Sequence, residues 1–68
     1  MEFVLKGSLH IALCDLLKVS GLCETGGQAK HLIADGKVTV DGVVELQKRA
    51  KIIKGQVVKY NNQQIKVV

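Results

Sequence analysis

The sequence predicts a single α+β domain over residues 1–68, in which two helices are followed by antiparallel strands. Apolar residues recur with a helical period of about 3.6 as far as Gly36 and alternate with a period of two beyond it. Asp41-Gly42 and Asn61-Asn62 interrupt the alternating part, as tight turns between strands do. No proline, repeat or linker divides the chain. The expected element order is therefore β-α-α-β-β-β-β.

The first expected helix covers residues 9–19 and follows "EFVL", which would add an edge strand. Ser8 can cap the helix start, and Gly21 stands where a helix end favours a residue with positive φ. One side of the helix is predicted to be buried, because its apolar residues fall at i, i+3, i+4, i+7 and i+8. These residues are Leu9, Ala12, Leu13, Leu16 and Leu17.

The second expected helix covers residues 26–35. Thr25 and Gln28 have the spacing of a capping box, in which side chains bind the free backbone N–H groups at the helix start. Gly36 is predicted to end the helix. The buried stripe is expected to be Ala29, Leu32 and Ile33, and the outward face Gly27, Lys30, His31 and Ala34.

Two adjacent glycines, Gly26 and Gly27, occupy the start of this second helix. Helix N-termini present unbonded N–H groups and the positive end of the helix dipole, so they attract anions. Glycines would let a phosphate reach those groups, with Lys30 and His31 one turn further along the same face. The alternative is that the glycines only allow a tight turn or a close contact between helices. Both explanations fit the spacing.

Two hairpins are predicted in the second half. "KVTV" and "VVEL" flank Asp41-Gly42, which is the strongest short-range signal for a two-residue hairpin. "KIIKGQVVKY" and "QQIKVV" flank Asn61-Asn62, and a further turn is expected at Lys54-Gly55. All these strands would belong to one α+β unit.

Positive charge is concentrated near the C-terminus. The formal net charge of +4 divides into 0 over residues 1–23, −2 over residues 24–46 and +6 over residues 47–68. This asymmetry favours a polyanion as partner, and the alternative is a solvated, lysine-rich surface. The run "QKRAKIIK" could contact several phosphates from an irregular connection through Lys48, Arg49, Lys51 and Lys54.

The composition narrows the function further. With one Phe, one Tyr and no Trp, the chain offers few rings on which single-stranded bases could stack. No apolar stretch approaches the roughly 20 residues that cross a bilayer, and no secretory signal is recognised. We therefore expect a cytoplasmic protein without a membrane partner.

Neither a metal site nor a catalytic site is expected. His10, Cys14, Cys23 and His31 do not have the spacing of a compact metal site, so no metal or other cofactor is predicted. No nucleophile, base and electrophile can be named that would converge, so the function is expected to be non-enzymatic. The two cysteines are predicted to be buried thiols rather than a disulfide.

The stretch "GLCETGGQAKHLIADGKVTVDGVVE" resembles the RNA-binding domain typified by the fourth protein of the small ribosomal subunit. This domain is also called the α-L motif, and the closest resemblance is to its stand-alone bacterial members, the YbcJ-like subgroup. The likeness covers about residues 9–59 and includes Thr25-Gly26, Asp35-Gly36, Val40-Asp41-Gly42 and Lys54-Gly55-Gln56. It implies two helices packed on a small, twisted antiparallel sheet. It also implies binding of structured RNA, commonly ribosomal, by the helical face and the adjoining hairpin.

Two arginines by which the larger family contacts RNA are absent from this chain. Gly26 stands at one of these positions, and Ala12-Leu13-Cys14 replaces an Arg-Leu-Asp near the start of the first helix. The resemblance implies that Lys48, Arg49 and Lys51 supply the missing charge.

We therefore expect a monomeric, non-catalytic domain that binds structured RNA, with ribosomal RNA or the ribosome as partner. The alternative is a protein-interaction module, in which the basic residues dock an acidic partner or a ribosomal protein. The expected RNA-binding residues are Gly26, Gly27, Gln28, Lys30, His31, Lys37, Lys48, Arg49, Lys51 and Lys54.

Overall fold

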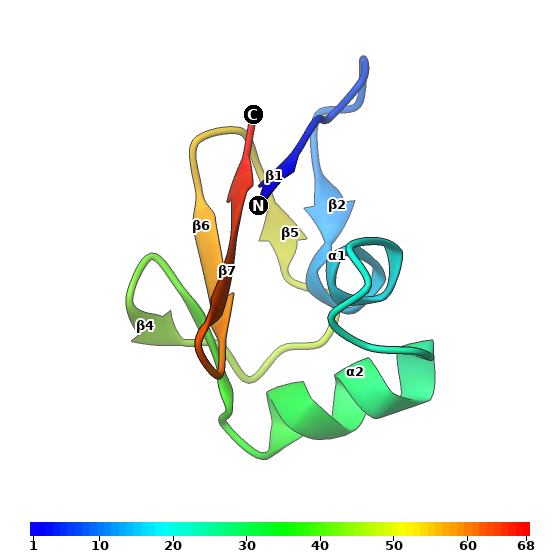
Figure 1. Cartoon of the computed structure of the whole chain (residues 1–68), viewed down its shortest axis with the longest axis vertical. Coiled ribbons are helices and arrows are strands. Elements are labelled where there is room, and N and C mark those ends of the chain that lie inside the picture. Colours follow the sequence, from blue (N-terminus) through cyan, green and yellow to red (C-terminus); the bar gives the residue numbers. More distant parts are fainter.

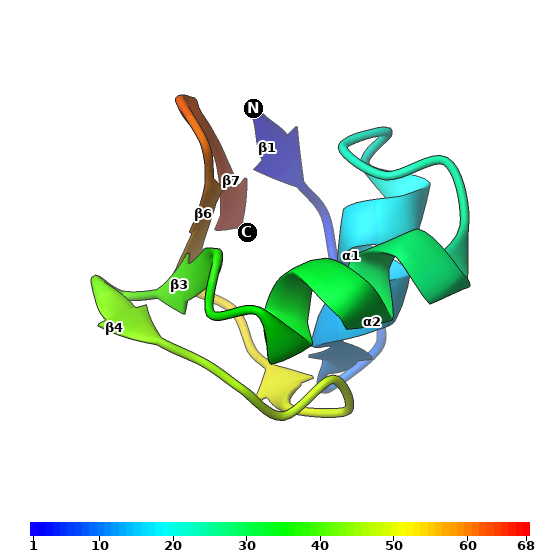
Figure 2. The same cartoon turned by 90° about the horizontal axis from the view of Figure 1, so that it is seen from below.

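Two helices pack against one face of a five-stranded sheet in the computed structural model, which describes all 68 residues (Figures 1 and 2). The strand order is β1-β7-β6-β3-β4. β1 (Glu2–Phe3) runs parallel to β7 (Gln63–Val67), which confirms the edge strand in "EFVL", and the other pairs are antiparallel. The α+β class and the mostly antiparallel sheet are thus confirmed. The remaining strands of this sheet are β3 (Val38–Val40), β4 (Val43–Val44) and β6 (Val57–Tyr60).

Both predicted hairpins form. Asp41 and Gly42 join β3 to β4 with φ angles of 52° and 84°, and positive angles at both positions match the twist of the flanking strands. Asn61-Asn62 joins β6 to β7. The turn at Lys54-Gly55 is also present, but it leads from β5 (Lys51–Ile52) to β6 without pairing them. β5 instead forms a separate two-stranded sheet with β2 (Ile11–Ala12).

The predicted start of the first helix is wrong. α1 spans Leu13–Val19, Ser8 does not cap it, and Leu9 is 88% exposed rather than buried. The two residues before α1 form β2, which pairs with β5 about 40 residues later in the chain. Backbone pairing with this distant segment therefore overrides the local helical period. Ala12 lies in β2 and is only partly buried, whereas Leu13, Leu16 and Leu17 are fully buried on the helix as predicted.

The second helix agrees with its prediction to within one residue. α2 spans Gly26–Ala34, and the Thr25 side chain accepts a hydrogen bond from the Gln28 N–H at 3.1 Å. In return, Gln28 Oε1 accepts from the N–H of Glu24 at 2.9 Å, one residue further upstream than a capping box requires. Gly36 follows the helix with φ at 74°.

An aliphatic core joins the two helices to the sheet. Ala29 and Ile33 anchor α2 in this core, and the opposite face of α2 is exposed, as predicted for Gly27, Lys30, His31 and Ala34. No buried residue is polar or charged. No helix has the length and apolar character needed to cross a membrane. The buried residues are Leu13, Cys14, Leu16, Leu17, Cys23, Ala29, Ile33, Val38, Ile52, Val58, Ile65 and Val67.

Candidate nucleic-acid interface

The start of α2 is open to solvent. The N–H groups of Gly26 and Gly27 donate no hydrogen bond within the protein, whereas those of Gln28 and Ala29 donate to Thr25. Neither glycine has a positive φ. A Cβ added at Gly26 would meet no other atom within 4 Å, and one added at Gly27 would meet only Thr25 Oγ1 at 3.9 Å. Neither a tight turn nor a helix contact therefore requires these two glycines.

The start of α1 is closed. The N–H of Leu13 donates to the carbonyl of Ala50 at 2.9 Å, and the N–H of Cys14 donates to the carbonyl of Lys48 at 3.0 Å. These carbonyls occupy donors that an anion would need. Of the two helices, α2 is therefore the one whose positive end can face a phosphate.

A line of exposed basic side chains leads away from the open end of α2. Lys30 and His31 lie one turn after Gly27 on the exposed face, and Lys37 is exposed just before β3. We call Gly27, Lys30, His31 and Lys37 the α2 strip; Figure 2 views the molecule from the side of α2. No Lys or Arg side chain of the chain donates a hydrogen bond within the protein. The cations of the strip are free to meet an external anion.

Gln28, which is predicted to contact RNA, also stabilises the start of α2. Its N–H is held by Thr25 and its Oε1 by Glu24, so both groups contribute to the helix start. The Nε2 amide makes no hydrogen bond within the protein and remains available as a donor. A contact between Gln28 and RNA would therefore be made through this amide.

The structure divides the predicted basic run into two parts. Lys48 and Arg49 lie in a turn, and Lys51 is exposed on β5, so these three stay together beside the start of α1. Lys54 lies apart from them, because the next residue, Gly55, donates its N–H to Val67 near the C-terminus. In Figure 1 the turn between β5 and β6 lies at the top and α2 at the bottom, at opposite ends of the long axis.

Two residues that the sequence analysis did not name as site residues lie beside Lys37. Tyr60 and Asn61 line an open hollow with it, because the register of β3 and β6 places Val38 opposite Tyr60. The register depends on pairing between segments about 20 residues apart. A sequence signal does exist in hindsight, since Tyr60 is the only tyrosine and directly precedes the Asn61-Asn62 turn.

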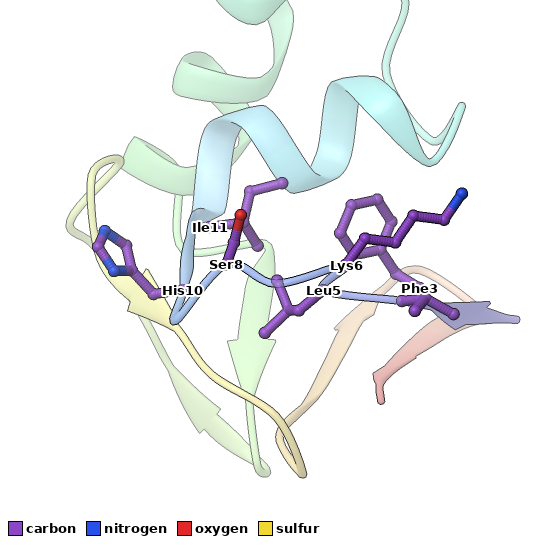
Figure 3. A pocket seen from close by; sticks show the side chains of 7 residues that line it. Phe3, Leu5, Lys6, Ser8, His10 and Ile11 are labelled. Carbon is purple, nitrogen blue, oxygen red and sulfur yellow. The ribbon is translucent and has the colours of Figure 1, made fainter.

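A second hollow, of about 260 Å³, lies on the N-terminal segment and has mainly apolar walls (Figure 3). Ligand sites combine such walls with a few polar groups that converge on the ligand. Here the Lys6 and His10 side chains extend to opposite sides of the segment (Figure 3). This hollow therefore lacks the convergent polar groups of a ligand site. Its lining consists of Phe3, Val4, Leu5, Lys6, Ser8, His10 and Ile11.

The cysteines and histidines do not gather into a site. No group of three or more His, Cys, Asp or Glu side chains lies close enough to hold a metal ion. Cys14 and Cys23 are free and buried. Burial raises the pKa of the Cys23 thiol, which favours the neutral form over the nucleophilic thiolate.

Comparisons with known proteins agree with the resemblance noted in the sequence. The chain is 52% identical over 59 residues to the "Putative RNA-binding protein YbcJ" of Escherichia coli strain K12. The matched residues make up 87% of this chain and 84% of that protein. The solution structure of E. coli YbcJ, described as revealing an αL motif involved in RNA binding, superimposes with a TM-score of 0.77. That match covers 98% of this chain and 85% of YbcJ at 49% identity.

A more distant similarity concerns the fold alone. The crystal structure of the 30S ribosomal protein S4e from Thermoplasma acidophilum matches with a TM-score of 0.63 and 23% identity. The match covers 84% of this chain and 30% of the ribosomal protein.

Finally, the family model of the S4 domain matches residues 3–68. Because this match spans almost the whole sequence and the identity to YbcJ is high, the chain belongs to the S4 domain family.

Proposed function

We propose that the chain binds structured RNA, and ribosomal RNA in particular, without catalysing a reaction. The observation that carries the proposal is the open start of α2, where two glycine N–H groups have no acceptor within the protein and no close neighbour stands at either Cβ position. The cationic side chains of the α2 strip continue from that point.

Relatives support the RNA part of the proposal. The similar E. coli protein carries an RNA-binding name, and its structure is described as containing a motif involved in RNA binding. The fold shared with a 30S ribosomal protein is consistent with ribosomal RNA as the RNA class. Membership of the S4 domain family agrees with RNA as the partner.

A phosphate at the start of α2 would accept hydrogen bonds from the N–H groups of Gly26 and Gly27, aided by the helix dipole. Lys30, His31 and Lys37 would meet further phosphates of the same strand. Lys48, Arg49 and Lys51 form a second group of cations beside α1 and would contact a neighbouring strand of a folded RNA. With one arginine in the whole chain, recognition would depend on the shape of the RNA backbone more than on base edges.

The proposal is tested by fluorescence anisotropy of the purified chain with folded fragments of ribosomal RNA over a salt titration. We expect affinity to fall with a log-log salt slope of several units, because phosphate contacts release counterions. Replacing Lys48, Arg49 and Lys51 together with Glu should flatten the slope. The side chains of all three residues are exposed, and the hydrogen bond of Lys48 to α1 uses its carbonyl, so the fold should persist.

Competitors give the test its specificity. Single-stranded RNA and double-stranded DNA of equal length should compete less well than the folded fragment, because shape is the feature recognised. Absence of binding at low salt by the folded chain would contradict the proposal. A complex with a protein partner that forms without RNA and survives nuclease treatment would instead support the protein-interaction alternative.

A further inference from the structure

The hollow between the end of β6 and the start of β3 combines three different chemical groups. It is lined by Lys37, Tyr60 and Asn61 and has a volume of about 410 Å³. This volume falls within the range of about 300–1,000 Å³ that is typical of ligand sites. No carboxylate lines the hollow, so its charge favours an anionic occupant.

The three side chains have no competing partner within the protein. None of the side-chain hydrogen bonds involves the Lys37 ammonium, the Tyr60 hydroxyl or the Asn61 amide. The Tyr60 ring is half-buried and packs against the aliphatic core, which fixes its position. Asn61 has a φ of 61°, a left-handed conformation that asparagine tolerates at a tight turn. The Tyr60 ring would therefore need little ordering on binding.

The chemistry of the lining matches one nucleotide. An aromatic ring stacks on the face of any base, an ammonium neutralises a phosphate, and an amide offers both a donor and an acceptor to a base edge. A base can enter such an open hollow only when it is unpaired, because a paired base is held inside its helix. Tyr60 is one of only two aromatic residues in the chain, and it lies in this hollow.

The hollow also lies along the path proposed for the RNA. Lys37 belongs to the α2 strip, and the nine residues of α2 rise about 14 Å between the open helix start and this end. In Figure 1 the turn between β6 and β7 lies at the same end of the molecule as α2. An RNA strand whose phosphates follow the strip would therefore arrive at the hollow.

We infer that this hollow receives one unpaired base of the bound RNA, stacked on Tyr60, with its phosphate on Lys37. The inference rests on the RNA binding proposed above and adds the kind of RNA that is selected. The chain should prefer an RNA duplex with one bulged base to a fully paired duplex of the same length. Asn61 then favours bases whose exposed edge complements an amide.

The test uses NMR of the chain labelled with ¹³C-tyrosine, which reports on Tyr60 alone because no other tyrosine exists. We expect the ring signals to move upfield on titration with an RNA duplex that carries one bulged purine. A fully paired control duplex of the same length should bind without this shift. In anisotropy, Tyr60→Leu should weaken binding of the bulged duplex about 5- to 150-fold, the range expected for loss of one base stack, and leave binding of the paired duplex unaffected.

Tyr60→Phe is the matched control, since it keeps the ring and removes the hydroxyl. Its affinity for the bulged duplex should stay close to that of the unchanged chain. If both duplexes bind with the expected salt dependence and the Tyr60 signals do not move, the inference is wrong and the proposed function stands. If neither duplex binds at low salt, the proposed function fails and the inference fails with it. Even if Tyr60→Leu does not fold, the ring signals of the unchanged chain show whether a base stacks on Tyr60.

Discussion

Gly26 and Gly27 are the residues whose presence is hardest to explain by folding alone. Glycine in a helix is less stable than alanine by roughly 0.5–1 kcal/mol, since the unfolded chain loses more conformational freedom. At these positions the backbone needs no positive φ, and space for a Cβ exists. In a domain this small, where the net stability is marginal, such a cost calls for a compensating role. We propose that access of a phosphate to the two N–H groups is that role.

A single substitution separates stability from binding at this site. Gly27→Ala should stabilise the chain by about 0.4–1 kcal/mol, because the unfolded state loses freedom while the folded state gains no clash. The same Cβ should weaken RNA binding by obstructing the approach to the helix start. Urea denaturation and anisotropy measure the two effects. Since the variant is more stable, weaker binding could not be attributed to unfolding, and unchanged affinity would remove the role assigned to Gly27.

At the scale of elements, local signals fixed α2 and distant ones fixed the start of α1. Thr25, Gln28 and Gly36 mark the ends of α2 within the helix itself, so the sequence predicted its bounds closely. The start of α1 depends on pairing of Ile11 with Ile52, which periodicity in one stretch cannot reveal.

In the candidate site too, some features follow from local sequence and others from pairing between distant segments. The exposed face of α2 could be predicted from helical spacing, because it follows from the burial of Ala29 and Ile33. The separation of Lys54 from Arg49 depends on the path of the chain through β5, and the meeting of Lys37 with Tyr60 depends on strand register. Both outcomes depend on pairing between strands far apart in sequence, which charge and composition do not encode.

The contrast between the two helix starts gives a prediction about capping. Thr25→Ala should lower the free energy of unfolding by about 1 kcal/mol, because its side chain caps α2 through the Gln28 N–H. Ser8→Ala is the control: Ser8 is exposed, and its side chain makes no hydrogen bond within the protein, so stability should hardly change. Urea denaturation of both variants checks the pair. Equal losses would mean that Ser8 caps α1 as its sequence position suggests.

At the scale of the whole molecule, cations lie at both ends of a body that measures 30 × 23 × 19 Å. The α2 strip lies at one end of the long axis, whereas the loop that carries Lys6 and the end of β7 that carries Lys66 lie at the other (Figure 1). A general attraction to RNA would use the cations of both ends alike. A defined interface would use those of the α2 strip.

The most direct test of RNA binding by the α2 strip compares two variants of equal charge. Lys30→Gln/Lys37→Gln and Lys6→Gln/Lys66→Gln each remove two positive charges from exposed positions, so both lower the net charge from +4 to +2. Anisotropy with a folded ribosomal RNA fragment should show weaker binding for the first variant and a salt slope smaller by about two units, one for each lost phosphate contact. The second variant should keep a slope close to that of the unchanged chain. Equal losses in both variants would contradict an interface at α2.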